Sequence, residues 1–139
     1  MSQGLVPDSI ASDIQIQAYE LNRLRSLLEY SSFYLHLGFS VDEVLRMITI
    51  APARFLRIED HAGSLALGRD ADIAVIDLVY GNWEFKDAND VSRVGSQALV
   101  PVLTIKCGRV IEPGEGLHPW GWAPPTVAAS GVQTAPLAR

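Results

Sequence analysis

The sequence contains little cysteine and no long apolar run, and each scarcity excludes a class of protein. Cys107 is the one cysteine among 139 residues, which excludes an intramolecular disulfide framework and a Cys-x-x-Cys metal motif. Its apolar context predicts a small buried side chain in a reduced compartment. No apolar run reaches the roughly 18 residues of a membrane helix. Met1–Pro7 lacks the basic and apolar regions of a secretory leader, so we expect a soluble, cytoplasmic protein without membrane contact.

The charge balance excludes a further class of partner. The formal net charge is -5, and the 11 Lys and Arg residues form no stripe or cluster, so no nucleic-acid partner is expected. The hydrophobic content of 48% excludes a disordered chain. A chain of 139 residues is also long enough for one domain with a core of its own.

The stretch Pro7–Ile14, and within it Asp13, organises the chain. Ile10–Ile16 has the pattern of a short buried strand that contains an acidic residue, Asp13, and a helical pattern follows over residues 18–37. In α/β barrels, catalytic groups lie at the carboxyl ends of strands that lead into helices. A helix cap or a loop position would also account for an aspartate here, and the stretch taken alone favours that simpler interpretation.

Two packed helices are predicted after this stretch. The first covers residues 18–37 and ends at Gly38, which is typical of a glycine just past a helix end. The second begins at Ser40 with a capping box, because Glu43 stands three residues later. Pro52 interrupts the apolar face of the second helix, which predicts a kink or a restart before Ala53–Leu56.

The pattern then changes from helical to strand-like and predicts a small sheet. Gly63–Gly68 has turn residues at both ends and is either a short edge strand or a loop. The predicted strands are Asp72–Leu78, Trp83–Phe85, and a hairpin of Val100–Lys106 with Arg109–Ile111 across the turn Cys107-Gly108. Residues 113–139 are rich in proline, glycine and alanine, which predicts a mobile tail.

Three segments together resemble the C-terminal end of the metal-dependent amidohydrolase superfamily. Pro7–Ile14 resembles the eighth-strand segment of the amidohydrolase/deacetylase branch, a group similar to dihydroorotases. Leu37–Val44, running into Thr49–Arg54, resembles the helix with the Thr-x-Asn-Pro-Ala signature, although Ala51 replaces the usual Asn. Gly63–Asp77 is very similar to the Gly-x-Leu-x-x-Gly-x-x-Ala-Asp element and is the most specific of the three.

This resemblance implies a fold and a domain organisation. The fold class is α/β: the C-terminal fragment of a TIM-type (β/α)8 barrel, followed by part of a small β-sandwich. Residues 1–60 would form the last strand and the C-terminal helices of the barrel, and residues 61–112 the sandwich-like strands. Residues 113–139 would form the tail. The resemblance extends over roughly residues 5–111.

The resemblance gives a role to one residue. In the family, the aspartate that closes the eighth strand binds the active-site metal and acts as the base for the attacking water, and Asp13 matches that position. The family often has a histidine two residues later; this chain has Gln15 there, so that contact has no counterpart. The implied cofactor of the complete enzyme is zinc or another divalent metal, and the implied substrate is a small-molecule amide or acyl compound.

The other metal ligands of the family have no match in this chain. A His-x-His pair and a bridging lysine are missing, and His36, His61 and His118 lack ligand spacing, so they are expected to be surface or helix-packing residues. Catalytic zinc needs about three protein ligands, so the isolated chain is expected to hold no metal and to be inactive. Two alternatives remain open: a fold remnant used as an interaction or assembly piece, or one chain of a split enzyme whose partner contains the missing barrel strands. Exposed apolar faces would then favour homo-oligomers.

Two further groups of residues have simple structural interpretations. Asp70, Asp72 and Asp77 lie close together in the sequence but lack the spacing and the glutamate of a calcium loop, so strand alternation explains them better. Three tryptophans are expected to be packing residues and not a ligand platform. These are Trp83, Trp120 and Trp122.

Overall fold

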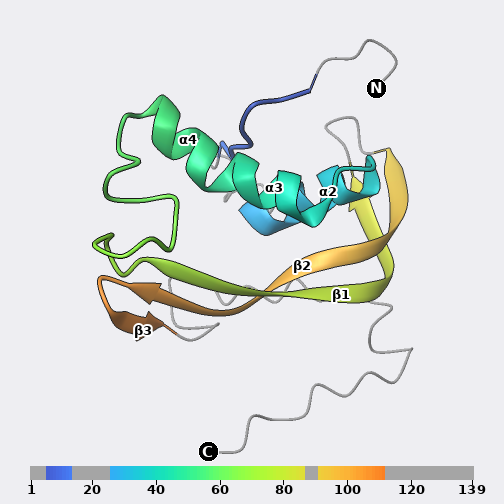
Figure 1. Ribbon diagram of the computed structural model, residues 1–139. Helices are drawn as coiled ribbons and strands as arrows, with labels where there is room; N and C mark the ends of the chain where they lie inside the picture. Colours follow the sequence, from blue (N-terminus) through green and yellow to red (C-terminus); the bar gives the residue numbers. More distant parts are fainter. Residues whose placement is uncertain (1–5, 14–25, 87–90, 112–139) are drawn as a thin grey trace, which may run out of the picture.

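In the described part of the chain, three helices cover one face of a three-stranded antiparallel sheet (Figure 1). The computed structural model describes residues 6–13, 26–86 and 91–111. Predictions for other residues, including Gln15, His118 and the tail, lie outside these ranges. The elements are α2 (Leu27–His36), α3 (Val41–Ile48), α4 (Ile50–Phe55), β1 (Ile73–Lys86), β2 (Ser92–Lys106) and β3 (Arg109–Ile111). Within the described ranges, none of the helices combines the length and apolar character that crossing a bilayer requires.

Helix α2 is delimited by side-chain and backbone caps at its two ends. Ser26 is the N-cap, and its hydroxyl accepts a hydrogen bond from the Glu29 amide at 3.1 Å. At the other end Gly38 has a φ of 99°, and the amides of Gly38 and Phe39 donate to the carbonyls of Leu35 and Tyr34. The predicted end at Gly38 is confirmed. Of the predicted range 18–37, residues 27–36 are helical and residues 18–25 lie outside the described part.

The second predicted helix is confirmed as α3 and α4, which are separated by a break at Thr49. Ser40 and Glu43 form the predicted capping box, with the Ser40 amide donating to the Glu43 carboxylate at 2.8 Å. Thr49 has a φ of -125° and a ψ of -90°, so the restart comes three residues before the position predicted from Pro52. Pro52 is the third residue of α4, where its missing N–H costs no hydrogen bond within the helix.

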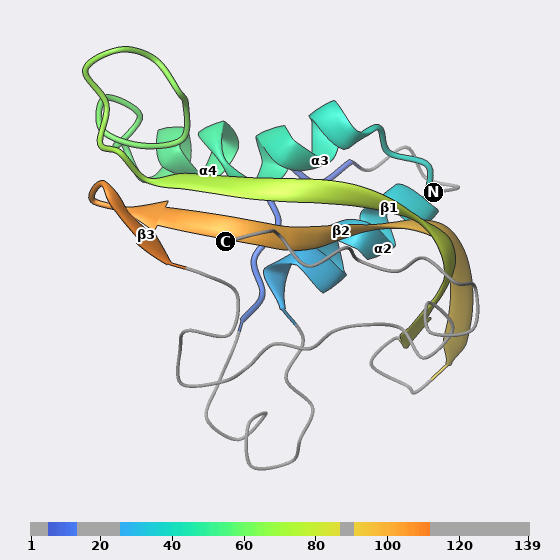
Figure 2. The same cartoon turned by 90° about the horizontal axis from the view of Figure 1, so that it is seen from below.

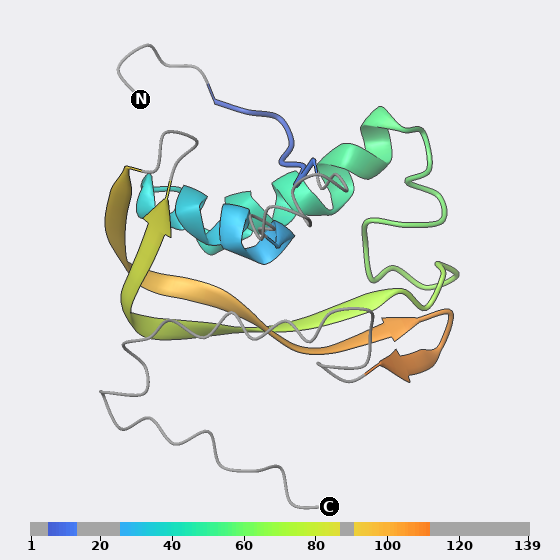
Figure 3. The same ribbon diagram turned by 180° about the vertical axis from the view of Figure 1, so that it is seen from behind.

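Strands β1 and β2 form one long, bent ribbon. The two segments predicted separately, Asp72–Leu78 and Trp83–Phe85, belong to the single strand β1 apart from Asp72 itself. The register with β2 shifts between Val75 and Ile76 and again between Tyr80 and Trp83. Extra residues of this kind bend a strand and increase its twist. Figure 3 shows the result: both strands curve at one end of the sheet and rise toward α2.

The β2–β3 hairpin is confirmed, but the burial predicted for Cys107 is wrong. Cys107 and Gly108 have φ values of 50° and 76°, so both turn residues are left-handed, as a tight two-residue hairpin requires. The thiol-bearing residue is exposed at the hairpin tip. The apolar pattern around Cys107 comes from the flanking strands, and the turn itself projects beyond them.

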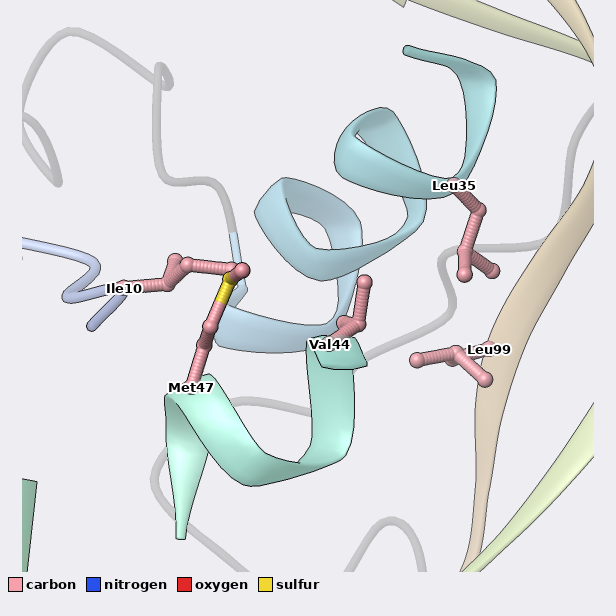
Figure 4. Packing of buried hydrophobic residues seen from close by; sticks show 5 residues of the cluster. All are labelled: Ile10, Leu35, Val44, Met47 and Leu99. Carbon is pink, nitrogen blue, oxygen red and sulfur yellow. The ribbon is translucent and has the colours of Figure 1, made fainter. Parts of the chain in front are cut away.

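The main hydrophobic cluster joins the helices, the sheet and the first described segment. Its buried members are Ile10, Leu35, Val44, Met47 and Leu99 (Figure 4). Side chains from the predicted 1–60 and 61–112 regions therefore share one core. A buried hydroxyl adds a polar link to this core: Ser32 accepts from the Leu99 amide at 2.8 Å and donates to the Leu28 carbonyl at 2.6 Å. The Ser32 bond satisfies a buried strand amide that would otherwise lack a partner.

A second cluster fills the bent end of the ribbon. Trp83, Phe85 and Ala98 are its buried members, and Phe33 of α2 packs against them. Trp83 is 2% exposed, which confirms its predicted packing role. Gly95 lies opposite Trp83, and a Cβ at this glycine would stand 2.8 Å from the Phe85 ring. The close approach of the backbone to Phe85 therefore requires glycine.

Candidate functional site

Asp13 lies three residues after an anchored core residue. Ile10 is buried against Met47, and its amide donates to the Met47 carbonyl at the end of α3, with an N–O distance of 3.1 Å (Figure 4). Asp13 itself is exposed and has a φ of 45°. Aspartate is one of the few residues that adopt this left-handed conformation readily. Asp13 therefore combines an exposed position with a backbone conformation that few residues adopt, three residues after the core residue Ile10.

The predicted strand Ile10–Ile16 is wrong for residues 10–13, which the structure does not assign to any strand. A strand needs a neighbour for its ladder of hydrogen bonds, and the Ile10 amide instead bonds to the end of a helix. Residues 14–16 lie outside the described part. The burial of Ile10 agrees with the predicted apolar pattern, although the backbone conformation does not.

The described residues do not bring further metal ligands to Asp13. No group of three or more His, Cys, Asp or Glu residues that could hold a metal ion occurs in the ranges 6–13, 26–86 and 91–111. A zinc ion held by one carboxylate lacks the three or four protein ligands of known zinc sites. The donor set present in this part of the chain therefore does not fit a complete metal site.

The two described histidines have the structural positions expected of them. The His36 ring stacks on Phe85 with centroids 6.3 Å apart and lies 6.1 Å from the Phe33 ring. His61 is exposed in the loop after α4, where its backbone bonds to Ile58 and Asp70. His36 is thus a helix-packing residue and His61 a surface residue.

Asp72 fastens the hairpin tip to the start of β1. Its carboxylate forms an ion pair with Lys106 and accepts a hydrogen bond from the Cys107 amide at 2.8 Å. The Lys106 bond, and then the Cys107 bond, hold the pKa of the Asp72 carboxyl below its usual range. The same pair raises the pKa of Lys106. The Asp72 carboxylate therefore has a structural role, and its bonding partners are residues of this chain.

The neighbouring aspartates do not join Asp72 in a cation site. The Asp77 carboxylate accepts from the Leu78 amide at 2.8 Å, and the Asp70 amide donates to the His61 carbonyl at 3.1 Å. Asp77 thus bonds to the residue that follows it and Asp70 to a residue that precedes it. Both bonds agree with the structural interpretation of these aspartates.

The segment Gly63–Asp77 packs a loop against α4. Gly63 has a φ of 84°, and a Cβ there would stand 2.7 Å from the Ala53 Cβ and 3.0 Å from the Thr49 carbonyl oxygen. Gly68 has a φ of 86° and open space around it. Gly63–Gly68 is a loop, which settles the alternative left open by the sequence. The first glycine of this motif is thus required by close packing and the second by backbone conformation.

Comparison with known proteins identifies the group to which this arrangement belongs. The model of the amidohydrolase family matches residues 4–111. A deacetylase of Enterococcus faecalis is 25% identical over 112 residues, which are 81% of this chain and 30% of the deacetylase. The chain therefore spans about a third of the length of this relative.

Two solved structures extend the comparison to three dimensions. The crystal structure of an adenine deaminase is similar with a TM-score of 0.73 and 25% identity, covering 80% of this chain and 30% of the deaminase chain. The crystal structure of a dihydroorotase is similar with a TM-score of 0.69 and 25% identity, covering 80% of this chain and 29% of the dihydroorotase chain. The family match over residues 4–111, together with these relatives, shows that the chain belongs to the amidohydrolase family.

Proposed function

We propose that this chain is the C-terminal part of a metal-dependent amidohydrolase or deacetylase that hydrolyses an amide or related acyl bond. In this proposal residues 1–60 correspond to the end of the catalytic barrel, and residues 61–112, which contain the β1–β3 sheet, belong to an accompanying β-sandwich. Asp13 is the proposed ligand and base, and the attacking group is a water activated by zinc or another divalent metal. The names of the relatives, a deacetylase, an adenine deaminase and a dihydroorotase, support a hydrolase of this general type.

The observation that carries the proposal is the position of Asp13. The core holds the backbone at Ile10, and Asp13, three residues later, is exposed and has a left-handed φ of 45°. A carboxylate so close to a fixed core residue is restrained in position while it remains exposed. Such placement suits a group that works with partners from other segments.

The metal site of the proposed enzyme requires residues from outside the described part of this chain. Asp13 supplies one carboxylate, and no group of three possible ligands exists in those ranges. The relatives are about three times as long as the match, which leaves ample chain to supply the remaining ligands. We therefore propose that Asp13 is one ligand of a metal site to which other segments also contribute. The isolated chain is then expected not to hydrolyse a substrate.

A chimera tests the proposal. The matched segment of the Enterococcus faecalis deacetylase would be replaced by residues 4–111 of this chain, and metal content and hydrolysis of the deacetylase's own substrate would be measured. Because general acid–base groups contribute about 10² to 10⁴ in rate, Asp13→Ala is expected to lower activity by about 100-fold or more and to reduce bound metal. Asp72→Asn, a change at another exposed aspartate, is the control and should retain both. Equal activity and metal content in the Asp13→Ala chimera and the unmodified chimera would contradict the proposal.

The absence of a ligand group in the described residues favours a second candidate, in which the chain is one subunit of a split enzyme or a non-catalytic assembly piece. A purified mixture of this chain with the deacetylase lacking its matched segment separates the possibilities. Restored hydrolysis that depends on Asp13 supports a split enzyme. Stable binding without hydrolysis, despite an active chimera, supports an assembly piece.

A further inference from the structure

The last carbonyls of α3 take hydrogen-bond donors from outside the regular helical ladder. The Leu45 carbonyl accepts from the Thr49 hydroxyl at 2.6 Å, and the Arg46 carbonyl accepts from the Thr49 amide at 3.4 Å. The Met47 carbonyl accepts from the Ile10 amide at 3.1 Å. Because the last four carbonyls of a helix have no amide partners of their own, these donors make the end of α3 a binding point for other groups.

The carbonyl of Ile48 shows why α3 ends where it does. In an unbroken helix its donor would be the amide four residues later, and that residue is Pro52, which has no N–H. Thr49 has a φ of -125° and a ψ of -90°, which lie outside the helical region. In Figure 2, α3 and α4 follow each other in nearly the same direction, so the interruption is local. Thr49 and Pro52 thus break what would otherwise be one helix.

The break decides which amide the Met47 carbonyl binds. In an unbroken helix its donor would be the Ala51 amide, four residues later. At the break this carbonyl instead accepts from the Ile10 amide, and the Ile10 and Met47 side chains meet in the same core cluster (Figure 4). The backbone and the side chain of Met47 therefore both hold the chain at Ile10.

We propose that Thr49 is a positioning residue for Asp13. Thr49 interrupts the helix, the interruption leaves the Met47 carbonyl to the Ile10 amide, and this bond fixes the start of the segment that contains Asp13. The inference rests on the proposed function, in which the Asp13 carboxylate takes part in hydrolysis. Asp13 lies three residues after Ile10, so the two are at most about 10 Å apart along the chain. A displacement of about 1 Å at a reacting group can lower the rate by about 10².

The loop after α4 packs on the same break and offers a simpler explanation for it. A Cβ at Gly63 would stand 3.0 Å from the Thr49 carbonyl oxygen and 3.0 Å from the Ile50 Cα, so this loop needs the local shape of the chain at Thr49. If loop packing were the only role of the break, the bond of the Ile10 amide would not depend on the Thr49 hydroxyl. A positioning role predicts that it does.

Hydrogen exchange of the Ile10 amide in the full chain tests the inference without any hydrolysis. Pro52→Ala provides an amide for the Ile48 carbonyl and favours an unbroken helix, in which the Ala51 amide competes for the Met47 carbonyl. The Ile10 amide should then exchange about tenfold faster than in the natural protein, because it loses its acceptor.

A matched pair of variants at Thr49 tests the hydroxyl. Thr49→Val removes the hydroxyl and keeps the branched shape, and it should also make exchange of the Ile10 amide about tenfold faster. Thr49→Ser keeps the hydroxyl and should remain within about threefold of the natural protein. The Leu35 amide in the core of α2 provides the reference, so that a general loss of stability is not mistaken for a local one. Unchanged exchange of the Ile10 amide, relative to Leu35, in both Thr49→Val and Pro52→Ala would overturn the inference.

The chimera with the deacetylase measures the effect on catalysis and separates this inference from the proposed function. Thr49→Val and Pro52→Ala should each lower kcat by about 10- to 100-fold and leave KM within about threefold, because a displaced carboxylate impairs the reaction and not substrate binding. Thr49→Ser should keep kcat within about threefold. An Asp13→Ala chimera as active as the unmodified one would contradict the proposed function. A chimera that needs Asp13 but keeps its kcat in Thr49→Val and Pro52→Ala would overturn this inference alone.

Discussion

Asp13 and Asp72 are both exposed aspartates, yet the chain uses them differently. Asp72 has its partners within 35 residues, in Lys106 and the Cys107 amide, and its carboxylate is held by them in the hairpin. Asp13 follows a core anchor, and the described residues assemble no ligand group around it. The Asp72 carboxylate, held by Lys106 and the Cys107 amide, is therefore structural, whereas Asp13 is a candidate for chemistry with groups from other segments, because the described residues contain no group of three possible metal ligands.

The largest loss of stability should come from a substitution in the core that the Asp13 and Asp72 regions share. Leu99 of β2 is 2% exposed and belongs to the same core cluster as Leu35 of α2 and Val44 of α3. Leu99→Ala should destabilise the fold by about 2 to 5 kcal/mol through lost burial and a residual cavity. Urea unfolding followed by circular dichroism would measure this loss. If the helices and the sheet of the natural protein unfolded at different urea concentrations, the two aspartates would lie on independent units. That result would contradict a shared core.

The next effect concerns the loop that connects the two regions. Gly63→Ala places a Cβ 2.7 Å from the Ala53 Cβ in a backbone conformation that disfavours alanine, and should cost about 3 kcal/mol. Gly68→Ala has a similar φ but open space, so about 1 kcal/mol is expected. Thermal unfolding of the two variants separates packing from backbone strain. Equal costs at the two positions would show that the loop does not pack against α4 as closely as described.

A smaller effect should follow from the polar link in the core. Ser32→Ala leaves the buried Leu99 amide without an acceptor and should cost about 2 kcal/mol. Ser31→Ala is the matched control, because Ser31 is equally buried and its hydroxyl donates to the Leu27 carbonyl within the same helix. Its removal should cost less than about 1 kcal/mol. Denaturant titration of both variants gives the difference, and a Ser31→Ala protein that is the less stable of the two would contradict this account.

The smallest effect should come from the hairpin tip and depend on pH. The folded-state pKa of Asp72 is lowered, so its contribution is present above the ordinary value of 3.8 and is lost as pH falls through the lowered folded value. The pKa of Lys106 is raised, so the same pair is also lost at high pH, above the ordinary value of 10.5. Hydrogen exchange of the Cys107 amide should therefore be less protected in Asp72→Ala than in Asp72→Asn, which keeps an acceptor oxygen. Identical protection of the Cys107 amide in the two variants would contradict the structural role of Asp72.

Local signals in the sequence predicted the ends of elements well. The capping box of Ser40 and Glu43, the helix end at Gly38 and the hairpin turn at Cys107-Gly108 each depend on a few adjacent residues, and all three are confirmed. The family membership was also predicted, because the motif of Gly63–Asp77 is contiguous. Short-range backbone chemistry is therefore readable from the sequence.

Long-range features were not predictable in the same way. The pattern of Ile10–Ile16 is that of a strand, but the Ile10 amide bonds to the end of α3, a contact that the local sequence does not encode. The continuity of β1 through Gly81 depends on its pairing with β2, and Ser32 gains its role from Leu99, 67 residues away. A serine on an apolar helix face was the available signal for Ser32. The role of Asp13 stays a prediction of the family resemblance, because the described residues contain no group of three possible metal ligands that could test it.

Metal content of the purified, isolated chain, measured by elemental analysis, tests most directly the proposal that Asp13 contributes to a metal site whose other ligands come from outside this chain. The natural protein, Asp13→Ala and Asp72→Asn should all contain less than stoichiometric zinc or other divalent metal, and their contents should not differ. Stoichiometric metal in the natural protein that is lost in Asp13→Ala and retained in Asp72→Asn would contradict this account, because this chain would then assemble a metal site around Asp13 by itself.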